Sequence, residues 1–211
     1  MNGRRVLDPE APVGVRDQLG VDGAPVTERG KIYLAMNKPH GVVTTASDEK
    51  GRQTVYDLLD PELEWVGPVG RLDKASEGLL LLTNDSEWAA RVTDPARHLS
   101  KTYHVQVDCV ADSDLLRRMR RGVVVGSDPL RAKSARLLRQ GQKNSWLEII
   151  LDEGKNRQIR RMLAVFGVEV LRLVRVSVGP LTLGDLKKGA VRPLTPAEKR
   201  ALDQALGHGP V

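Results

Sequence analysis

A single carboxylate with a cation on either side marks the segment of this sequence that could do chemistry. Residues 67–85 read GPVGRLDKASEGLLLLTND and hold Asp73 between Arg71 and Lys74, in a loop bounded by glycines. Nearby cations favour the ionised form of a carboxyl group, so Asp73 could act as a nucleophile or a base. An Arg-Leu-Asp triplet alone leaves the alternative of a solvated surface turn.

Two elements are predicted to position this chemistry. The four leucines at 79–82 are too few to span a membrane and predict a buried strand, to which the Asp73 loop is attached. Residues 153–166 predict a helix whose apolar side chains have i, i+3, i+4, i+7 spacing: Ile159, Met162, Leu163 and Phe166. Arg160 lies about 100 degrees from Ile159 around this helix, at the edge of the apolar face. There it can point into a cleft, with an ordinary surface arginine as the alternative.

A third candidate lies on a predicted strand. Residues 101–109, KTYHVQVDC, alternate in polarity and place Tyr103 on the same face as Val105, Val107 and Cys109. Aromatic residues make up only 3% of the chain, so a tyrosine on a strand face stands out. The pattern alone leaves two interpretations open, a core tyrosine and a ring that packs against a ligand.

The remaining pattern indicates strands interrupted by a few helices. Residues 1–26 predict one or two hairpins, with a turn at Asp22-Gly23, and 27–31 a linker. Further strands are predicted at 32–36, 42–45, 131–138, 146–151 and 170–178. Helices are predicted at 54–59, at 86–92 with Ser86 as the cap, at 112–121, and at 195–206.

Composition limits the partners and the chemistry. A formal charge of +6, a pI near 9.6 and 40% hydrophobic residues in a 211-residue chain favour a folded protein with a polyanionic partner. The single cysteine, Cys109, excludes an internal disulfide and a cysteine zinc cluster, and the histidines have no ligand spacing. We therefore expect no metal. No signal peptide and no membrane-spanning run is visible, which predicts a cytoplasmic protein.

Four segments together resemble the motifs of one family. They are MNKPHGVVTT, GRLDKASEGLLLLTND, KTY and GKNRQIRRM. They resemble the bacterial ribosomal-RNA pseudouridine synthases, in the family that usually carries an N-terminal S-four-like RNA-binding module. The resemblance implies that Asp73 is the catalytic carboxylate and that Arg160 pairs with it. It also implies that Tyr103 packs against the target base, where its hydroxyl could exchange a proton.

The resemblance also implies a fold and a domain organisation. We expect an α+β pseudouridine-synthase fold, with a mixed, mainly antiparallel sheet, flanking helices and a central cleft between two subdomains. Residues 28–211 would form the catalytic domain. Residues 1–27 resemble the closing half of the S-four-like module, whose helical front half is absent, so we expect a remnant. Isomerising uridine adds and removes no atoms, so no cofactor is expected.

The basic residues near these motifs are candidates for RNA contacts. Arg71 is predicted to fill the space of the displaced base or to brace the strand, with a phosphate contact as the alternative. The other cations would hold the RNA backbone with salt-sensitive affinity: Lys38, Lys101, Lys155, Arg157, Arg161, Arg172 and Arg175. For Lys38, a plain turn lysine is the alternative.

The sequence therefore predicts a site-specific pseudouridine synthase that acts as a monomer on ribosomal RNA or a ribosomal assembly intermediate. Large-subunit RNA is preferred over small-subunit RNA on general resemblance. Two rivals remain at this stage. One is a non-catalytic RNA-binding or ribosome-assembly protein with the same fold. The other is a hydrolase of the nucleoside bond, which would use one carboxylate and a water.

Overall fold

The computed structural model describes residues 1–8, 10–14, 17–22, 24–25 and 30–207. The chain divides into two compact units, residues 1–31 and 32–211. In the first unit, β1 (Gly20–Val21) and β2 (Ala24–Pro25) pair antiparallel, which confirms a hairpin in this region. Gly23 of the predicted turn and residues 27–29 of the predicted linker lie outside the described residues.

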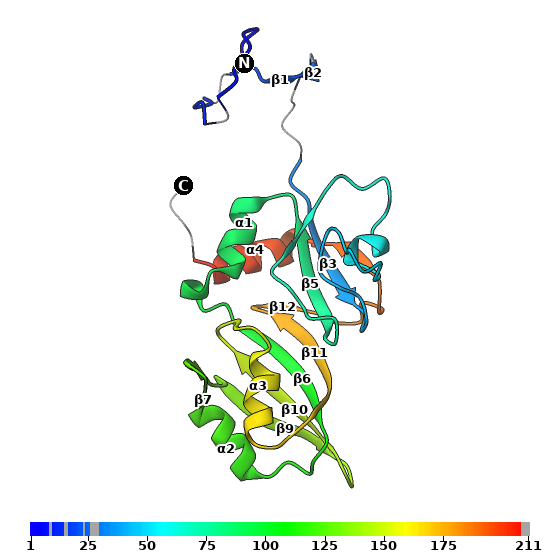
Figure 1. The fold of residues 1–211 in the computed structure, drawn as a ribbon, viewed down its shortest axis with the longest axis vertical. Coiled ribbons are helices and arrows are strands. Elements are labelled where there is room, and N and C mark those ends of the chain that lie inside the picture. Colours follow the sequence, from blue (N-terminus) through cyan, green and yellow to red (C-terminus); the bar gives the residue numbers. More distant parts are fainter. Residues whose placement is uncertain (9, 15–16, 23, 26–29, 208–211) are drawn as a thin grey trace. The chain divides into compact units, whose positions relative to one another are not determined.

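One mixed sheet runs through the described part of the second unit (Figure 1). Its strand order is β13-β3-β5-β11-β6-β10-β9, with β4 beside β5 and β12 beside β11. Its pairs are antiparallel except β5 with β11, which run parallel. The strands are β3 (Tyr33–Lys38), β4 (Gly67–Val69), β5 (Glu77–Thr83), β6 (Lys101–Val107), β9 (Ser134–Gln140), β10 (Ser145–Leu151), β11 (Val170–Val178), β12 (Leu181–Thr182) and β13 (Val191–Pro193).

The hydrophobic pattern explains the position of each strand in the sheet. β5 is buried along its whole length, which confirms the strand predicted from the four leucines. β10 alternates between buried and half-buried residues, as expected for a strand with one core face. The predicted strands at 32–36, 101–109, 146–151 and 170–178 are confirmed within two residues at either end.

Three of the α-helices in the described part of the chain begin at side-chain caps. α1 (Ser86–Thr93) is capped by Asp85, so the predicted cap at Ser86 was one residue late. α2 (Ser113–Arg121) is capped by Asp112, and α4 (Pro196–Ala205), within the helix predicted at 195–206, opens with a capping box at Thr195. The predicted helical stretch at 54–59 is a 3-10 helix, η1 (Val55–Leu58), and η2 (Pro95–Arg97) follows α1. No helix of the described residues is both long and apolar enough to cross a membrane.

Two predictions about secondary structure were wrong. Residues 42–45 form no strand, because this segment hydrogen-bonds to the 53–55 segment and leaves only an isolated bridge between Val43 and Thr54. The predicted helix at 153–166 begins only with α3 (Gln158–Val165), because Arg157 adopts the left-handed conformation with φ of 47°. The sequence reasoning also missed a hairpin made of β7 (Val123–Val125) and β8 (Asp128–Leu130).

Three hydrophobic clusters stabilise the second unit. One joins α2 and α3 to strands β6, β10 and β11, around Val105, Leu147 and Met162. Another joins α1 and α4 to β5, around Leu81 and Leu202. The third lies between β3, β5 and η1. All three clusters contribute side chains to the walls of a single cleft.

Candidate active site

The loop that carries Asp73 is fixed at both ends. β4 pairs antiparallel with β5, so residues 70–76 form the connection between two paired strands. Inside the loop, the Ser76 amide donates to the Asp73 carbonyl at 2.9 Å, and the Thr44 hydroxyl donates to the Leu72 carbonyl at 2.8 Å. Leu72 itself is buried. The Asp73 side chain, which is 33% exposed, is thus held on a rigid turn.

A glycine lets the next strand approach this loop closely. Gly78 has a φ of 103°, and a Cβ atom there would lie 2.2 Å from the Arg175 carbonyl oxygen of β11. Only glycine fits such an approach without moving the backbone. Arg175 pairs in turn with Tyr103 across β11 and β6. The close packing at Gly78 therefore brings the tyrosine strand next to the Asp73 loop.

The cleft has a volume of about 530 Å³ and is lined from several elements. Asp73 and Arg71 come from the loop, Lys101 and Tyr103 from β6, and Arg160 from α3. Lys155 and Arg157 come from the segment before α3. The structure thus brings together seven of the nine predicted site residues, and it leaves Lys38 and Arg161 outside the cleft lining.

The pairing predicted between Arg160 and Asp73 was wrong in its detail. The ion partner of Asp73 is Arg157, whose Nη1 lies 3.7 Å from the Asp73 Oδ2. Arg160 instead donates from Nη2 to the Ala75 carbonyl at 2.8 Å and from Nη1 to the Val170 carbonyl at 3.0 Å. Two main-chain oxygens thus accept hydrogen bonds from the Nη atoms of this half-buried guanidinium. The Arg160 side chain therefore contacts the backbone of the loop that carries Asp73.

The electrostatics of Arg160 agree with this arrangement. Burial lowers the pKa of its guanidinium, and the charge of Arg157 lowers it further, whereas Asp73 raises it. Its Nε atom is buried and has no hydrogen-bond partner among the described residues. The two arginines and the carboxylate are thus close enough to influence one another, although only Arg157 forms an ion pair with Asp73.

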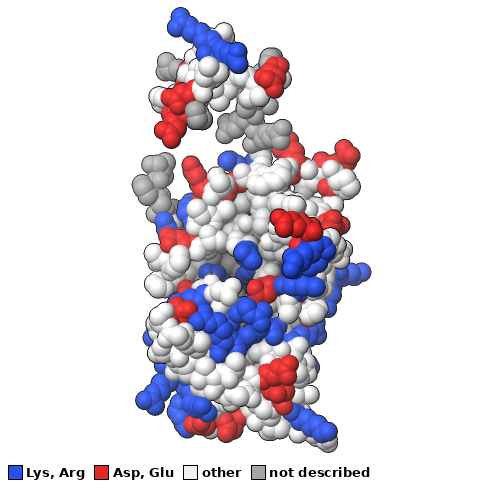
Figure 2. All heavy atoms as spheres, viewed as in Figure 1, with Lys and Arg blue, Asp and Glu red and all other residues white. Residues whose placement is uncertain are grey.

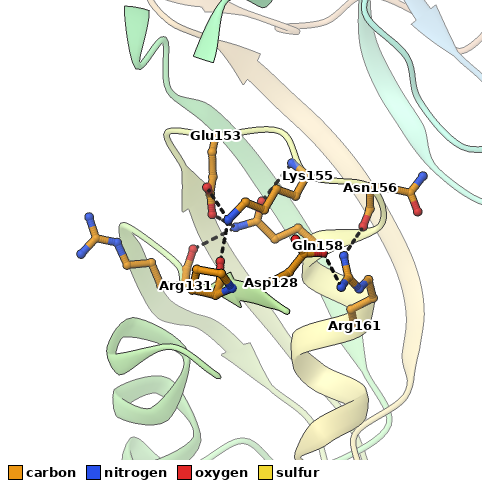
Figure 3. A network of polar contacts seen from close by, with 8 residues as sticks. Asp128, Arg131, Glu153, Lys155, Asn156, Gln158 and Arg161 are labelled. Atoms are coloured by element: carbon orange, nitrogen blue, oxygen red, sulfur yellow. Dashed lines mark hydrogen bonds and ion pairs between the residues drawn. The ribbon is translucent and has the colours of Figure 1, made fainter. Parts of the chain in front are cut away.

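A polar network holds the segment that carries Arg157 (Figure 3). Gln158 is 2% exposed and donates from Nε2 to Glu153 at 2.6 Å and to the Arg131 carbonyl at 3.1 Å. Lys155 pairs with Glu153 at 3.2 Å and donates to the Pro129 carbonyl at 2.6 Å. The network ties the start of α3 to β8 and to the residue that follows it, and so fixes the segment that carries Arg157.

Two residues predicted to hold the RNA backbone are committed to protein contacts, and a third is buried. Arg161 donates to Asp128 at 2.7 Å and to the Val125 carbonyl at 3.2 Å, which anchors the hairpin. Arg172 forms two bonds with Glu77, at 2.8 and 3.1 Å. Arg175 is only 6% exposed, so the expectation that it projects toward the RNA backbone was wrong.

Lys38 is neither a turn lysine nor a surface phosphate contact. It is fully buried at the end of β3 and donates from Nζ to the Ser76 carbonyl at 2.8 Å and to the Pro39 carbonyl at 3.0 Å. Burial lowers the pKa of Lys38 to about 8, against the opposing charges of Glu77 and Asp73. Lys38 therefore holds the end of the Asp73 loop through the Ser76 carbonyl. The MNKPHGVVTT motif gave no reason to expect this role.

The cleft and its surroundings carry an excess of positive charge. Among the lining residues, the cations outnumber the carboxylates: Arg71, Lys101, Lys155, Arg157, Arg160 and Arg175 against Asp73 and Glu153. Figure 2 shows basic side chains gathered across the middle of the second unit on this face, with acidic ones interspersed. Such a surface fits a polyanion that passes over a single reactive carboxylate.

The sequence reasoning missed three residues that support the site. Glu77 is 4% exposed and receives Arg172 and Lys188, and its position as a lone acid before an apolar strand could have signalled a buried ion pair. Gln158 lay within a quoted motif but received no role. Asp128 on β8 carried no signal that we can identify.

A mixed sheet whose cleft gathers a loop aspartate, a strand tyrosine, a helix arginine and the arginine just before that helix is the arrangement expected of an RNA pseudouridine synthase. The chain matches the family model described as RNA pseudouridylate synthase over residues 32–165. It is 36% identical over 211 residues to the ribosomal large subunit pseudouridine synthase B of Bacillus subtilis, covering 99% of this chain and 86% of that relative.

Further similarities agree with this match. The chain is 38% identical over 192 residues to an uncharacterized RNA pseudouridine synthase of Aquifex aeolicus, covering 90% of this chain and 77% of that relative. A solved structure of a pseudouridylate synthase is similar with a TM-score of 0.74 at 29% identity, covering 95% of this chain and 86% of that one. The chain belongs to the RNA pseudouridine synthase family and is an isomerase that converts uridine to pseudouridine. The predicted family, fold class and reaction are confirmed.

Proposed function

We propose that this enzyme isomerises one specific uridine of ribosomal RNA, with Asp73 as the catalytic carboxylate. The observation that carries the proposal is one cleft that holds Asp73 beside Tyr103 and two arginines within a basic surface. The name of the Bacillus subtilis relative supports ribosomal RNA as the substrate and favours the large subunit.

The reaction assigns a task to each cleft residue. The bond from ribose C1′ to N1 of uracil must break, the ring must turn, and C1′ must bond to C5, while the C5 hydrogen is lost and N1 gains one. Asp73 either attacks C1′ or adds to C6 of the base. Tyr103 packs against the uracil ring and could exchange a proton.

The arginines keep the carboxylate in place. Arg157 pairs with Asp73 directly, and Arg160 fixes the Ala75 carbonyl two residues further along the same loop. Positioning of this kind contributes strongly to catalysis, because small displacements of a reacting group slow the chemical step. Arg160 is therefore proposed as a positioning residue that acts through the loop.

The target base must leave its stack to reach the cleft. Arg71 is exposed at the cleft rim and is proposed to occupy the space of the displaced base or to brace the strand. Lys101, Lys155 and Arg157 are proposed to contact the phosphates of the target nucleotide and its neighbours. Residues 1–27 are proposed to belong to an S-four-like module, and residues 28–211 to form the catalytic domain.

A ribosomal RNA substrate also bears on where the enzyme works and in what oligomeric state. A protein that modifies ribosomal RNA meets it in the cytoplasm, as free RNA or in an assembly intermediate. Because one cleft holds all the proposed catalytic groups of a single chain, a monomer is sufficient for the reaction.

An experiment with purified components tests the proposal. The protein is incubated with transcripts of large-subunit and small-subunit ribosomal RNA, and pseudouridine is mapped with a carbodiimide reagent. We expect one modified uridine, no change in RNA mass, and no activity from Asp73→Ala. Binding without modification would favour the RNA-binding rival, and release of free uracil with an abasic ribose would favour the hydrolase.

A further inference from the structure

The floor of the cleft contains a buried arginine that the proposed reaction has not yet used. Arg175 lies on β11, is 6% exposed and lines the cleft. Its Nε donates to the Leu79 carbonyl at 2.7 Å, which fixes the plane of the guanidinium. A second arginine of the same strand, Arg172, is by contrast neutralised by Glu77.

The outer nitrogens of Arg175 have no partner. Within the described part of the chain, neither Nη atom forms a hydrogen bond or an ion pair. The Nη atoms also keep some solvent-accessible surface: the fully buried side-chain nitrogens without a partner in the described residues are the Nε atoms of Arg91 and Arg160. A buried charged group without partners is costly, and proteins keep one mainly where a ligand completes it. The four N–H groups of the two Nη atoms are thus available to a molecule in the cleft.

The neighbours of Arg175 indicate which molecule that is. Arg175 is the direct cross-strand partner of Tyr103, so the two side chains lie side by side on the cleft floor. Lys101, two residues before the tyrosine, is also half-buried there. Burial lowers the pKa of Lys101, and the charge of Arg175 lowers it further. This end of the cleft therefore holds two cations and favours a ligand group that carries negative charge.

We propose that Arg175 is a catalytic residue that donates hydrogen bonds to the C4 carbonyl oxygen of the displaced uracil. If Tyr103 packs against the ring, the adjacent guanidinium lies at the ring edge, where the carbonyl oxygens are. This inference rests on the proposed function and names the group that stabilises the base during isomerisation.

The chemistry places negative charge on O4 by either route open to Asp73. If Asp73 attacks C1′, the N1–C1′ pair stays with uracil, and the anion is shared among N1, O2 and O4. If Asp73 adds to C6, the C5–C6 double-bond electrons move toward C4 and leave an enolate on O4. A fixed, water-shielded cation beside O4 stabilises both intermediates more than the neutral base.

A phosphate is the less suitable ligand for this arginine. The Arg157 side chain, at 49% exposure, stands where a backbone phosphate can reach it, whereas Arg175 lies below the cleft walls. The nucleotide part that enters deepest is the displaced base itself. A phosphate contact by Arg175 would instead appear as a loss of RNA affinity.

The test compares Arg175→Met and Arg175→Lys with the wild type under single-turnover conditions, on the ribosomal transcript that the wild type modifies. We expect Arg175→Met to form pseudouridine about 10²-fold more slowly with an unchanged Kd for RNA. Arg175→Lys should lose about tenfold, since the charge remains and the planar fork is lost. Arg136→Met, on the exposed strand β9, is the control and should keep the wild-type rate.

A modified RNA separates this role from a structural one. Replacing O4 of the target uridine by sulfur weakens the hydrogen bond that Arg175 would make. The ratio of the rates on the oxygen and sulfur RNAs should differ about tenfold between wild type and Arg175→Met. Equal ratios, a wild-type rate in Arg175→Met, or a rate loss explained by a weaker Kd would each overturn the inference. If the wild type modifies no transcript, the proposed function itself is refuted, and the inference with it.

Discussion

Asp73 and Glu77 are four residues apart, and their carboxylates have opposite environments. Glu77 at the start of β5 has a side chain that is 6% exposed, and it receives Arg172 at 2.8 Å and Lys188 at 2.6 Å. Asp73 in the preceding loop is 33% exposed and has one cation at 3.7 Å. The loop around Asp73 is nevertheless rigid, because Lys38 and Arg160 bind the carbonyls of Ser76 and Ala75.

The difference separates a structural carboxylate, Glu77, from the carboxylate that we propose to be reactive, Asp73. The hydrogen bonds of Glu77 use both of its oxygens, so it stabilises the junction of β5, β11 and the segment that carries Lys188. Asp73 is held through the backbone of its loop, which leaves its oxygens available to a substrate in the cleft. The protein thus fixes the position of Asp73 without neutralising it.

The largest effect should come from Asp73→Asn. We expect the single-turnover rate of pseudouridine formation to fall about 10³-fold or more, because the amide cannot act as a nucleophile. The free energy of unfolding should change by less than about 1 kcal/mol, since the side chain forms only one long ion pair. Rate assays and urea unfolding of the same preparation check both parts. A large loss of stability would contradict the distinction from Glu77.

Arg160→Met should be the next most damaging change. Without the bond to the Ala75 carbonyl the Asp73 loop shifts, and we expect the rate to fall about 10²-fold. The Kd for RNA should stay within about threefold, because the guanidinium binds the protein rather than phosphate. A filter-binding titration beside the single-turnover assay separates the two. A Kd increase that accounts for the lost rate would indicate an RNA contact instead.

Glu77→Gln should have the opposite effect to Asp73→Asn, with a large loss of stability and a small change in rate. Removing this buried charge leaves Arg172 and Lys188 without their partner, and we expect a loss of about 2 kcal/mol of stability, moderated because both cations are partly exposed. The rate per folded molecule should stay within about twofold. Urea unfolding and a rate assay at low temperature measure the two quantities, and a rate loss comparable to that of Asp73→Asn would refute the structural role.

The pH dependence of the free energy of unfolding should also show that the ionised Glu77 carboxylate stabilises the fold. Burial alone would raise the pKa of Glu77, but the bonds from Arg172 and Lys188 outweigh it and lower the pKa to about 2. A lowered folded-state pKa adds stability above the unfolded value near 4.5, which is lost as the pH falls toward 2. The stability difference between wild type and Glu77→Gln should therefore shrink between pH 5 and pH 2. A constant difference would contradict this assignment.

The smallest effect should be on the salt dependence of RNA binding. Arg157→Ala removes one half-exposed cation from the cleft rim, and we expect the slope of log Kd against log salt to fall by about one. Glu77→Gln is the matched control and should keep the wild-type slope. Affinities measured at four salt concentrations are sufficient. An unchanged slope in Arg157→Ala would place the RNA backbone elsewhere.

The sequence predicted the elements that carry Asp73, Tyr103 and Arg160, because each has a local pattern of its own. The leucine run, the alternation of β6 and the helical spacing of α3 depend only on neighbours in the chain. The cleft that unites them was expected from the family motifs. Seven of the nine predicted site residues line this cleft. The ion pair of Asp73 is formed by Arg157 and not by the predicted Arg160.

The errors arose where contacts between distant segments decide the outcome. Arg175 was expected to hold the RNA backbone, but it is buried on the cleft floor, because β11 packs closely against β5 at Gly78 and pairs with β6 at Tyr103. Lys38 is buried because the Ser76 carbonyl, which is 38 positions away, accepts its bond. The left-handed Arg157, which directs the ion pair to Asp73, depends on a network with β8 that no local pattern reveals.

The central claim is that Asp73 catalyses pseudouridine formation at one ribosomal site. The most direct test maps pseudouridine with a carbodiimide reagent in ribosomal RNA from a strain that lacks this protein, complemented with wild type or Asp73→Ala. We predict that one site disappears in the deletion strain and returns only with the wild type. No change at any site, or equal restoration by Asp73→Ala, would contradict the account.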